Sequence, residues 1–77
     1  MISEHSRVVL TKDLPERGLE QGDVGTAVHV YSNADAFEIE FVSLSGRTLC
    51  VETVPADAVR AVRETELSKA REFVTAA

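Results

Sequence analysis

The side chains of this chain that could do chemistry are few and widely spaced. The soft metal ligands are two histidines and one cysteine, at His5, His29 and Cys50. No two of them have the short spacing of a zinc site, and no glycine-rich elbow presents a serine as a nucleophile. We therefore expect no metal, no cofactor and no catalytic residue, and we expect the chain not to be an enzyme.

The run from Gly22 to Thr26, with the sequence GDVGT, has the glycines that a phosphate-binding loop would need. Such a loop also needs a lysine and a following helix whose N-terminus faces the phosphate, and the sequence has neither at this place. We interpret the run structurally instead. Gly22 and Asp23 turn the chain into a strand, and Gly25 allows a tight bend or close packing between strands.

The remaining candidates are three carboxylates, Glu38, Glu40 and Glu52. Paired carboxylates perform acid and base catalysis when a pocket holds the substrate between them, but nothing in the sequence indicates a pocket of that size. One interpretation is a solvated acidic face, which is common on antiparallel strands. The other is that this face binds a partner.

The composition limits the chain to one folded domain. A chain of 77 residues builds a single hydrophobic core, and 44% apolar with 27% charged residues is ordinary globular composition. The 13 acidic and 8 basic residues give a net charge of -5. This sign disfavours nucleic acid as a ligand, because a protein that binds phosphate backbones is usually basic.

The same composition bears on the compartment. No apolar stretch approaches the roughly 18 residues of a membrane-spanning helix, so we expect no membrane contact. A single cysteine forms no internal disulfide, and the first residues lack the basic start and apolar run of a signal peptide. We therefore expect a cytoplasmic protein.

Apolar and polar residues alternate in short runs between turn-forming residues, which predicts β-strands. The predicted strands are residues 7–11, 24–31, 36–41, 47–54 and 58–62. Residues 12–23 are expected to form a long ordered loop, with Leu14 and Leu19 as its apolar contacts. From residue 64 to residue 76 the apolar residues recur at helical spacing, which predicts a C-terminal helix.

The loops at residues 32–35 and 44–46 set the register of the three middle strands, because counting outward from them places apolar residues opposite apolar residues. The predicted inner face consists of Val28, Val30, Phe37, Ile39, Phe41, Leu49 and Val51. Two rows are predicted on the outer face, His29 with Glu38 and Glu52, and Ala27 with Glu40 and Cys50.

We therefore predict a mainly β fold, a small SH3-like five-stranded antiparallel barrel with a C-terminal α-helix. The barrel domain is predicted to span residues 1–63 and the helix residues 64–77. The helix would carry an apolar stripe that either packs across the barrel or binds another chain. That stripe consists of Leu67, Ala70, Phe73, Val74 and Ala77.

Several motifs follow one another in a specific order: residues 8–15 (VVLTKDLP), 18–19 (GL) and 22–26 (GDVGT), then Tyr31 and residues 37–41 (FEIEF). In this order the chain resembles an uncharacterised family of short bacterial proteins, domain of unknown function 4926, over residues 7–62. The resemblance implies an SH3-like small barrel without established catalytic residues. It also implies a gene that forms the small half of a two-gene cassette, and hence an antitoxin-like or immunity-like role.

Together these observations predict a non-catalytic protein-binding module whose partner is a basic, toxin-like protein. The alternative is an accessory barrel subunit that stabilises a larger enzyme complex through the C-terminal helix, which is also the element expected to mediate any homo-oligomer. The residues expected to bind the partner are His29, Tyr31, Glu38, Glu40, Glu52, Leu67 and Phe73.

Overall fold

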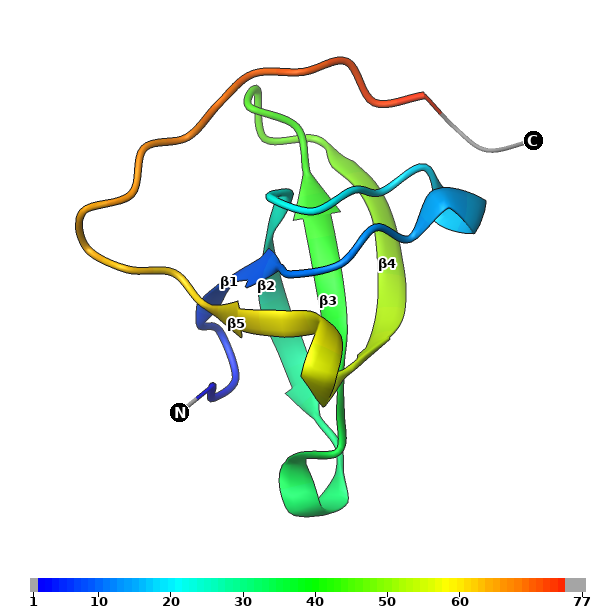
Figure 1. The fold of residues 1–77 in the computed structure, drawn as a ribbon, viewed down its shortest axis with the longest axis vertical. Helices are drawn as coiled ribbons and strands as arrows, with labels where there is room; N and C mark the ends of the chain where they lie inside the picture. The colour runs from blue at the N-terminus through cyan, green and yellow to red at the C-terminus, as the bar shows by residue number, and fades with distance from the viewer. Residues whose placement is uncertain (1, 75–77) are drawn as a thin grey trace.

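The computed structural model describes residues 2–74 and consists of one five-stranded antiparallel sheet. Its strands are β1 (Arg7–Leu10), β2 (Val24–Val30), β3 (Ala36–Val42), β4 (Thr48–Pro55) and β5 (Val59–Ala61), in the order β4-β3-β2-β1-β5 (Figure 1). Three single-turn 3₁₀ helices lie between strands: η1 (Pro15–Arg17), η2 (Ser32–Ala34) and η3 (Ala56–Ala58). The mainly β class and the five antiparallel strands are confirmed.

The turns that the sequence predicts are found where strands reverse direction. Ser43 donates its backbone N–H to the Arg47 carbonyl at 2.8 Å, and Gly46 adopts a φ of 94°. A positive φ of this kind is accessible to glycine at little cost. The β3–β4 hairpin is therefore set by its local sequence.

The predicted closure of the sheet into a barrel is wrong. β4 and β5 lie at opposite edges of the sheet, and no backbone ladder joins them. Two local features explain why they do not pair: Pro55 has no N–H to donate, and β5 has only three residues. At the free edge of β4, the Thr53 carbonyl accepts a hydrogen bond from Arg17 Nη1 at 3.0 Å instead.

The predicted C-terminal helix is also wrong. Residues 62–74 contain no helix and form an extended segment, here called the strap, that runs from the end of β5 to the loop around η1 (Figure 1). A helix this short is marginal in water unless it packs on the fold. The extended strap instead makes ion pairs that include Arg60–Glu66 and Arg71–Asp23. Of the predicted helix, residues 75–77 lie outside the described residues.

The hydrophobic core lies on one face of the sheet and under the β1–β2 loop, where Leu19 is buried. Ile39 and Phe41 of β3 are buried as predicted. Gly25 lies between the strands at a point without space for a side chain, because a Cβ there would clash with Ile39 and lie 2.9 Å from the Glu40 carbonyl oxygen. The core residues are Val8, Leu10, Leu19, Ala27, Phe37, Ile39, Phe41, Val54, Ala58 and Val59.

Two β-bulges change the predicted register. The β2–β3 pairing shifts between Ala27 and His29, so that Val28 is the extra residue, and the β3–β4 pairing shifts between Phe41 and Val42, so that Leu49 is the extra residue. Because side chains alternate with a period of two, one extra residue moves every later side chain to the other face.

The prediction of the inner face is therefore only partly correct. Phe37, Ile39 and Phe41 are buried and Val30 packs partly against the core, but Val28, Leu49 and Val51 are exposed. Their places are taken by Ala27 on β2 and by Cys50, Glu52 and Val54 on β4.

Candidate functional site

The face of the sheet opposite the core, here called the outer face, brings together side chains from four strands. One cross-strand row pairs Arg7 with Thr26, Thr26 with Glu40, and Glu40 with Val51. A second row pairs His29 with Glu38 and Glu38 with Thr53. Residues paired in this way lie on the same face with Cβ atoms about 5 Å apart, so polar and apolar groups alternate across the surface.

Both carboxylates of the outer face are held by hydroxyl groups of β4. Thr48 Oγ1 donates a hydrogen bond to Glu40 Oε2 at 2.6 Å, and Thr53 Oγ1 donates one to Glu38 Oε1. The predicted opposition of Glu38 and Glu52 is therefore replaced by a pairing of Glu38 with a neutral donor. These contacts orient the two carboxylates and leave the negative charge on the outer face.

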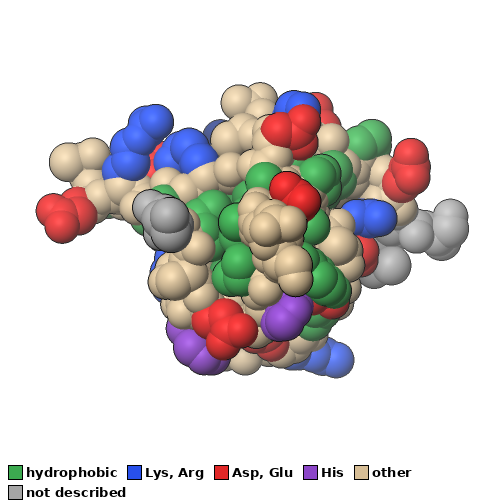
Figure 2. Space-filling view, turned by 90° about the horizontal axis from the view of Figure 1, so that it is seen from below, with side chains coloured by type: hydrophobic (Ala, Val, Ile, Leu, Met, Phe, Trp, Pro, Cys, Tyr) green, Lys and Arg blue, Asp and Glu red, His purple; other side chains and the backbone are tan. Residues whose placement is uncertain are grey.

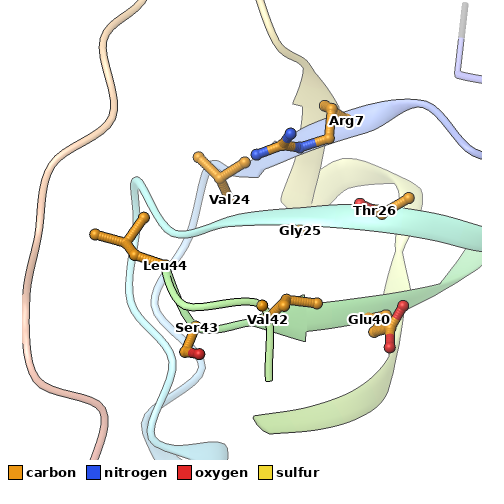
Figure 3. A pocket seen from close by; sticks show the side chains of 9 residues that line it. Arg7, Val24, Gly25, Thr26, Glu40, Val42, Ser43 and Leu44 are labelled. Carbon is orange, nitrogen blue, oxygen red and sulfur yellow. The ribbon is translucent and has the colours of Figure 1, made fainter. Parts of the chain in front are cut away.

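A shallow groove of about 350 Å³ lies at one end of the outer face (Figure 3). Arg7 on β1 and Glu40 on β3 line it with opposite charges, and Thr26 lies between them in the same row. Val24, Val42 and Leu44 supply apolar surface at the end of the groove near the β3–β4 hairpin. The groove thus offers one cationic, one anionic and one apolar surface to a bound group.

Aliphatic side chains of β3 and β4 are exposed next to the two carboxylates. The exposed fractions are 37% for Val42, 38% for Leu49 and 48% for Val51, and Leu44 in the hairpin is 79% exposed. Exposed apolar side chains interspersed with polar groups are compatible with a protein-binding surface.

The end of β2 carries an aromatic pair. The rings of His29 and Tyr31 meet edge to face with centroids 4.7 Å apart, and His29 Nδ1 lies 3.7 Å from Glu4 Oε2. Seen from the β2–β3 loop, hydrophobic side chains gather around the loop, and most charged side chains lie further out (Figure 2). Tyr31 is 40% exposed and contributes to this end of the molecule.

The predicted binding residues do not all form one surface. His29, Glu38 and Glu40 share the outer face, and Tyr31 lies against His29. Glu52 lies on the inner face, where its Oε1 is 3.2 Å from Arg17 Nε. The prediction that Glu52 shares a row with His29 and Glu38 is wrong because of the bulge at Leu49.

The two predicted binding residues of the C-terminal segment lie apart from the outer-face rows. Leu67 belongs to no helix and is 95% exposed in the strap. Phe73 packs partly against the core. The apolar stripe that their helical spacing predicts is therefore not formed, because this segment contains no helix.

The sequence did not indicate Arg7, Val24, Thr26, Val42 or Leu44 as site residues. The position of Thr26 opposite Glu40 follows from the register once the bulge at Val28 is known. The proximity of Arg7 and Leu44 to this position depends on the pairing of β1 with β2 and on the path of the hairpin. No local sequence signal shows either of them.

Cys50 is half-buried on the inner face. Burial raises the pKa of its thiol, and the negative charges of Glu52 and Asp23 raise it further. A raised pKa keeps the thiol protonated and makes it a weak nucleophile. Within residues 2–74, no three His, Cys, Asp or Glu side chains converge so that they could hold a metal ion, and no described helix is long and apolar enough to cross a membrane.

The fold and the outer face define a class, a small antiparallel β-sheet domain with a mixed acidic and apolar surface. The chain belongs to the family described as Domain of unknown function (DUF4926), which matches residues 4–61. The match includes all five strands and excludes the strap. No significant similarity was found to any curated protein or to any solved structure.

Proposed function

We propose that this chain is a non-catalytic protein-binding module and that its outer face is the binding surface. The observation that carries the proposal is the arrangement of Glu38 and Glu40, two carboxylates oriented by threonine hydroxyls, beside the half-exposed Val42 and Val51. Apolar contact supplies most of the affinity of a protein interface, whereas charged groups supply specificity and a faster association.

The partner that fits this surface is a basic protein with apolar side chains next to its lysines or arginines. The net charge of -5 attracts such a partner over several ångströms before contact. A basic, toxin-like protein has this chemistry, so we propose an antitoxin-like or immunity-like role within a two-gene cassette. We propose the cytoplasm as the location, where a lone cysteine stays reduced.

The accessory-subunit hypothesis relied on a C-terminal helix as the binding element. Residues 62–74 contain no helix, so neither that association nor a homo-oligomer through such a helix is proposed. The outer face does not depend on a helix and combines charge with exposed apolar area.

The test is a comparison of two charge-reversal variants of the tagged full chain in its native cell. One carries Glu38→Lys with Glu40→Lys on the outer face. The control carries Glu16→Lys with Glu64→Lys, which changes the net charge equally at two exposed positions away from it. Co-purifying proteins are identified by mass spectrometry, and binding of the identified partner is then measured by calorimetry.

We expect the outer-face variant to lose the partner, with a decrease in affinity of roughly tenfold or more, and the control to keep it. Circular dichroism confirms that both variants are folded. Equal binding by the outer-face variant and the unmodified chain would show that the partner binds elsewhere.

A further inference from the structure

The strap ends in a contact that joins two segments 48 residues apart in the sequence. The Arg71 guanidinium donates to both carboxylate oxygens of Asp23, from Nε to Oδ1 at 2.8 Å and from Nη2 to Oδ2 at 2.6 Å. Nη2 also donates to the Gly18 carbonyl at 2.9 Å, and Nε lies 3.7 Å from Glu20 Oε1. We call this set of acceptors, Gly18, Glu20 and Asp23, the arginine receptor.

The Asp23 carboxylate and the Gly18 backbone of the arginine receptor are held by contacts that do not involve the strap. The Glu20 N–H donates to Asp23 Oδ2 at 2.9 Å, and the Asp23 N–H donates back to the Glu20 carbonyl at 3.1 Å. Gly18 ends η1 with a φ of 72° and donates its N–H to the Pro15 carbonyl. The receptor is therefore preorganised by its own loop, which lowers the cost of binding a guanidinium.

A second subsite lies next to the arginine receptor. Phe73, two residues after Arg71, packs partly against the hydrophobic core. The absence of a side chain at Gly18 allows the Val74 backbone to approach, because a Cβ there would clash with the Val74 carbonyl oxygen. The loop therefore accommodates a peptide backbone with an arginine and, two positions later, an aromatic residue.

The surface is not filled by the strap. An open groove of about 370 Å³ remains beside Arg71 and Val74 and is lined by Asp13, Pro15 and Leu19. The arginine receptor also lies inside residues 4–61, which match the family, whereas Arg71 and Phe73 lie outside them. The part of the chain that defines the family thus contains the receptor without its present occupant.

We propose that the arginine receptor and its neighbouring apolar subsite bind a segment of a partner protein with the pattern arginine, any residue, aromatic residue. Residues 71–74 occupy the site in cis and compete with that segment. The acidic acceptors fit a guanidinium, and the proposal does not depend on the outer face being a binding surface. It adds a second, competitively regulated site for a basic partner.

The test uses the full chain and a fluorescent peptide with the sequence of residues 68–74, SKAREFV. In the unmodified chain the strap is present at a high effective concentration and competes with the peptide. Arg71→Gln removes the competing guanidinium, so we expect it to bind the peptide roughly tenfold more tightly than the unmodified chain does. Glu72→Gln is the matched control in the strap, and we expect it to bind as weakly as the unmodified chain.

Two further arms assign the binding to the arginine receptor. A peptide with glutamine in place of its arginine is expected to lose roughly tenfold in affinity for the Arg71→Gln chain. Adding Asp23→Asn to Arg71→Gln is expected to weaken binding of the original peptide by a similar factor. If this double variant does not fold, the amide resonances of Gly18, Glu20 and Asp23 in Arg71→Gln report the site, and peptide must shift them.

Equal affinity of the unmodified and Arg71→Gln chains, or shifts confined to other residues, would overturn the proposal. A dimeric unmodified chain that becomes monomeric with Arg71→Gln in analytical ultracentrifugation would also overturn it, because the occupant would then be the strap of a second copy. The outer-face variant with Glu38→Lys and Glu40→Lys is expected to bind the peptide normally once it carries Arg71→Gln. This arm separates failure of one site from failure of the other.

Discussion

At the scale of single residues, Gly25 shows how a small side chain permits a close approach between strands. The residue has an ordinary strand conformation and pairs with Val8. Glycine is therefore needed here because it has no side chain, and not because of its backbone freedom. A Cβ at this position would clash with Ile39 and lie 3.1 Å from a ring carbon of Phe41. In the glycine-rich run, Gly25 thus permits close packing between strands. Asp23, two residues earlier, accepts hydrogen bonds from Arg71.

We expect Gly25→Ala to destabilise the protein by about 1–3 kcal/mol, because the added methyl overpacks a buried contact. Where space allows, the same substitution usually stabilises by reducing the entropy of the unfolded chain, by about 0.4–1 kcal/mol. The sign of the change in the free energy of unfolding therefore distinguishes a tightly packed site from one with free space. Urea denaturation measures this change. Thr26→Ala, on the opposite face, is the control and should cost less. A Gly25→Ala chain as stable as the original would show that the approach is not close.

Glu66 is the residue with the most strongly shifted carboxylate. The hydrogen bonds from Arg60 lower its pKa from the usual 4.5 to about 2, and the Arg63 backbone N–H contributes to the same shift. We expect Arg60→Gln to raise the pKa of Glu66 toward 4.5, as followed by carbon NMR of the side-chain carboxyl. The control Lys69→Gln also removes one positive charge, at a strap residue that does not contact Glu66. It should leave the pKa of Glu66 at about 2. An equal response to both substitutions would contradict the pairing.

At the scale of the elements, the bulge at Leu49 decides which side of β4 faces the core. Val54 is fully buried, whereas Val51 is 48% exposed. The resulting register places Val51 and Thr53 of β4 on the outer face beside the carboxylates of β3. Without the bulge at Leu49, Glu52 would face Glu38, and the outer face would lose Val51 and Thr53.

The pair of substitutions Val54→Thr and Val51→Thr measures this register. We expect Val54→Thr to cost about 1–3 kcal/mol in the free energy of unfolding, because it buries a hydroxyl group in the core. Val51→Thr should change stability by no more than about 0.5 kcal/mol, because the side chain is exposed and threonine suits a strand. A larger loss of stability for Val51→Thr than for Val54→Thr would instead support the predicted register, which has no bulge at Leu49.

At the scale of the whole molecule, the strap connects the end of the chain to its first long loop. Burial alone would raise the pKa of Asp23, but the hydrogen bonds from Arg71 and the Glu20 N–H outweigh burial and lower it below the usual 3.8. A lowered pKa in the folded state means that the ionised carboxylate stabilises the fold. This stabilisation is complete above the usual pKa and is lost as the pH falls through the lower, folded value.

We therefore expect the coupling between Asp23 and Arg71 to depend on pH. It is measured as a double-mutant cycle of Asp23→Asn and Arg71→Gln, from the free energies of unfolding of the four chains. The coupling should be favourable at roughly pH 6. It should diminish as the pH falls below the usual 3.8 and through the lowered pKa of Asp23, where the carboxylate becomes protonated. A coupling that does not change over this interval would show that the two charges do not interact in solution.

The sequence by itself determined the number and approximate bounds of the strands, the long loop between the first two of them and the β3–β4 hairpin. These features depend on local alternation, turn residues and glycines, which act between neighbours in the chain. It also determined that His29, Glu38 and Glu40 share one face, because the β2–β3 loop sets their register directly.

Only the tertiary structure decided the position of Glu52, the open sheet and the path of the strap. Each bulge is a response to packing across strands, and one extra residue reverses every later side chain. The apolar spacing of the last residues favoured a helix, but the ion pair of Arg60 with the nearby Glu66 and that of Arg71 with the distant Asp23 hold them extended. The approach of Arg71 to Asp23 across 48 residues has no local signal, because it exists only after the sheet and its loops have formed.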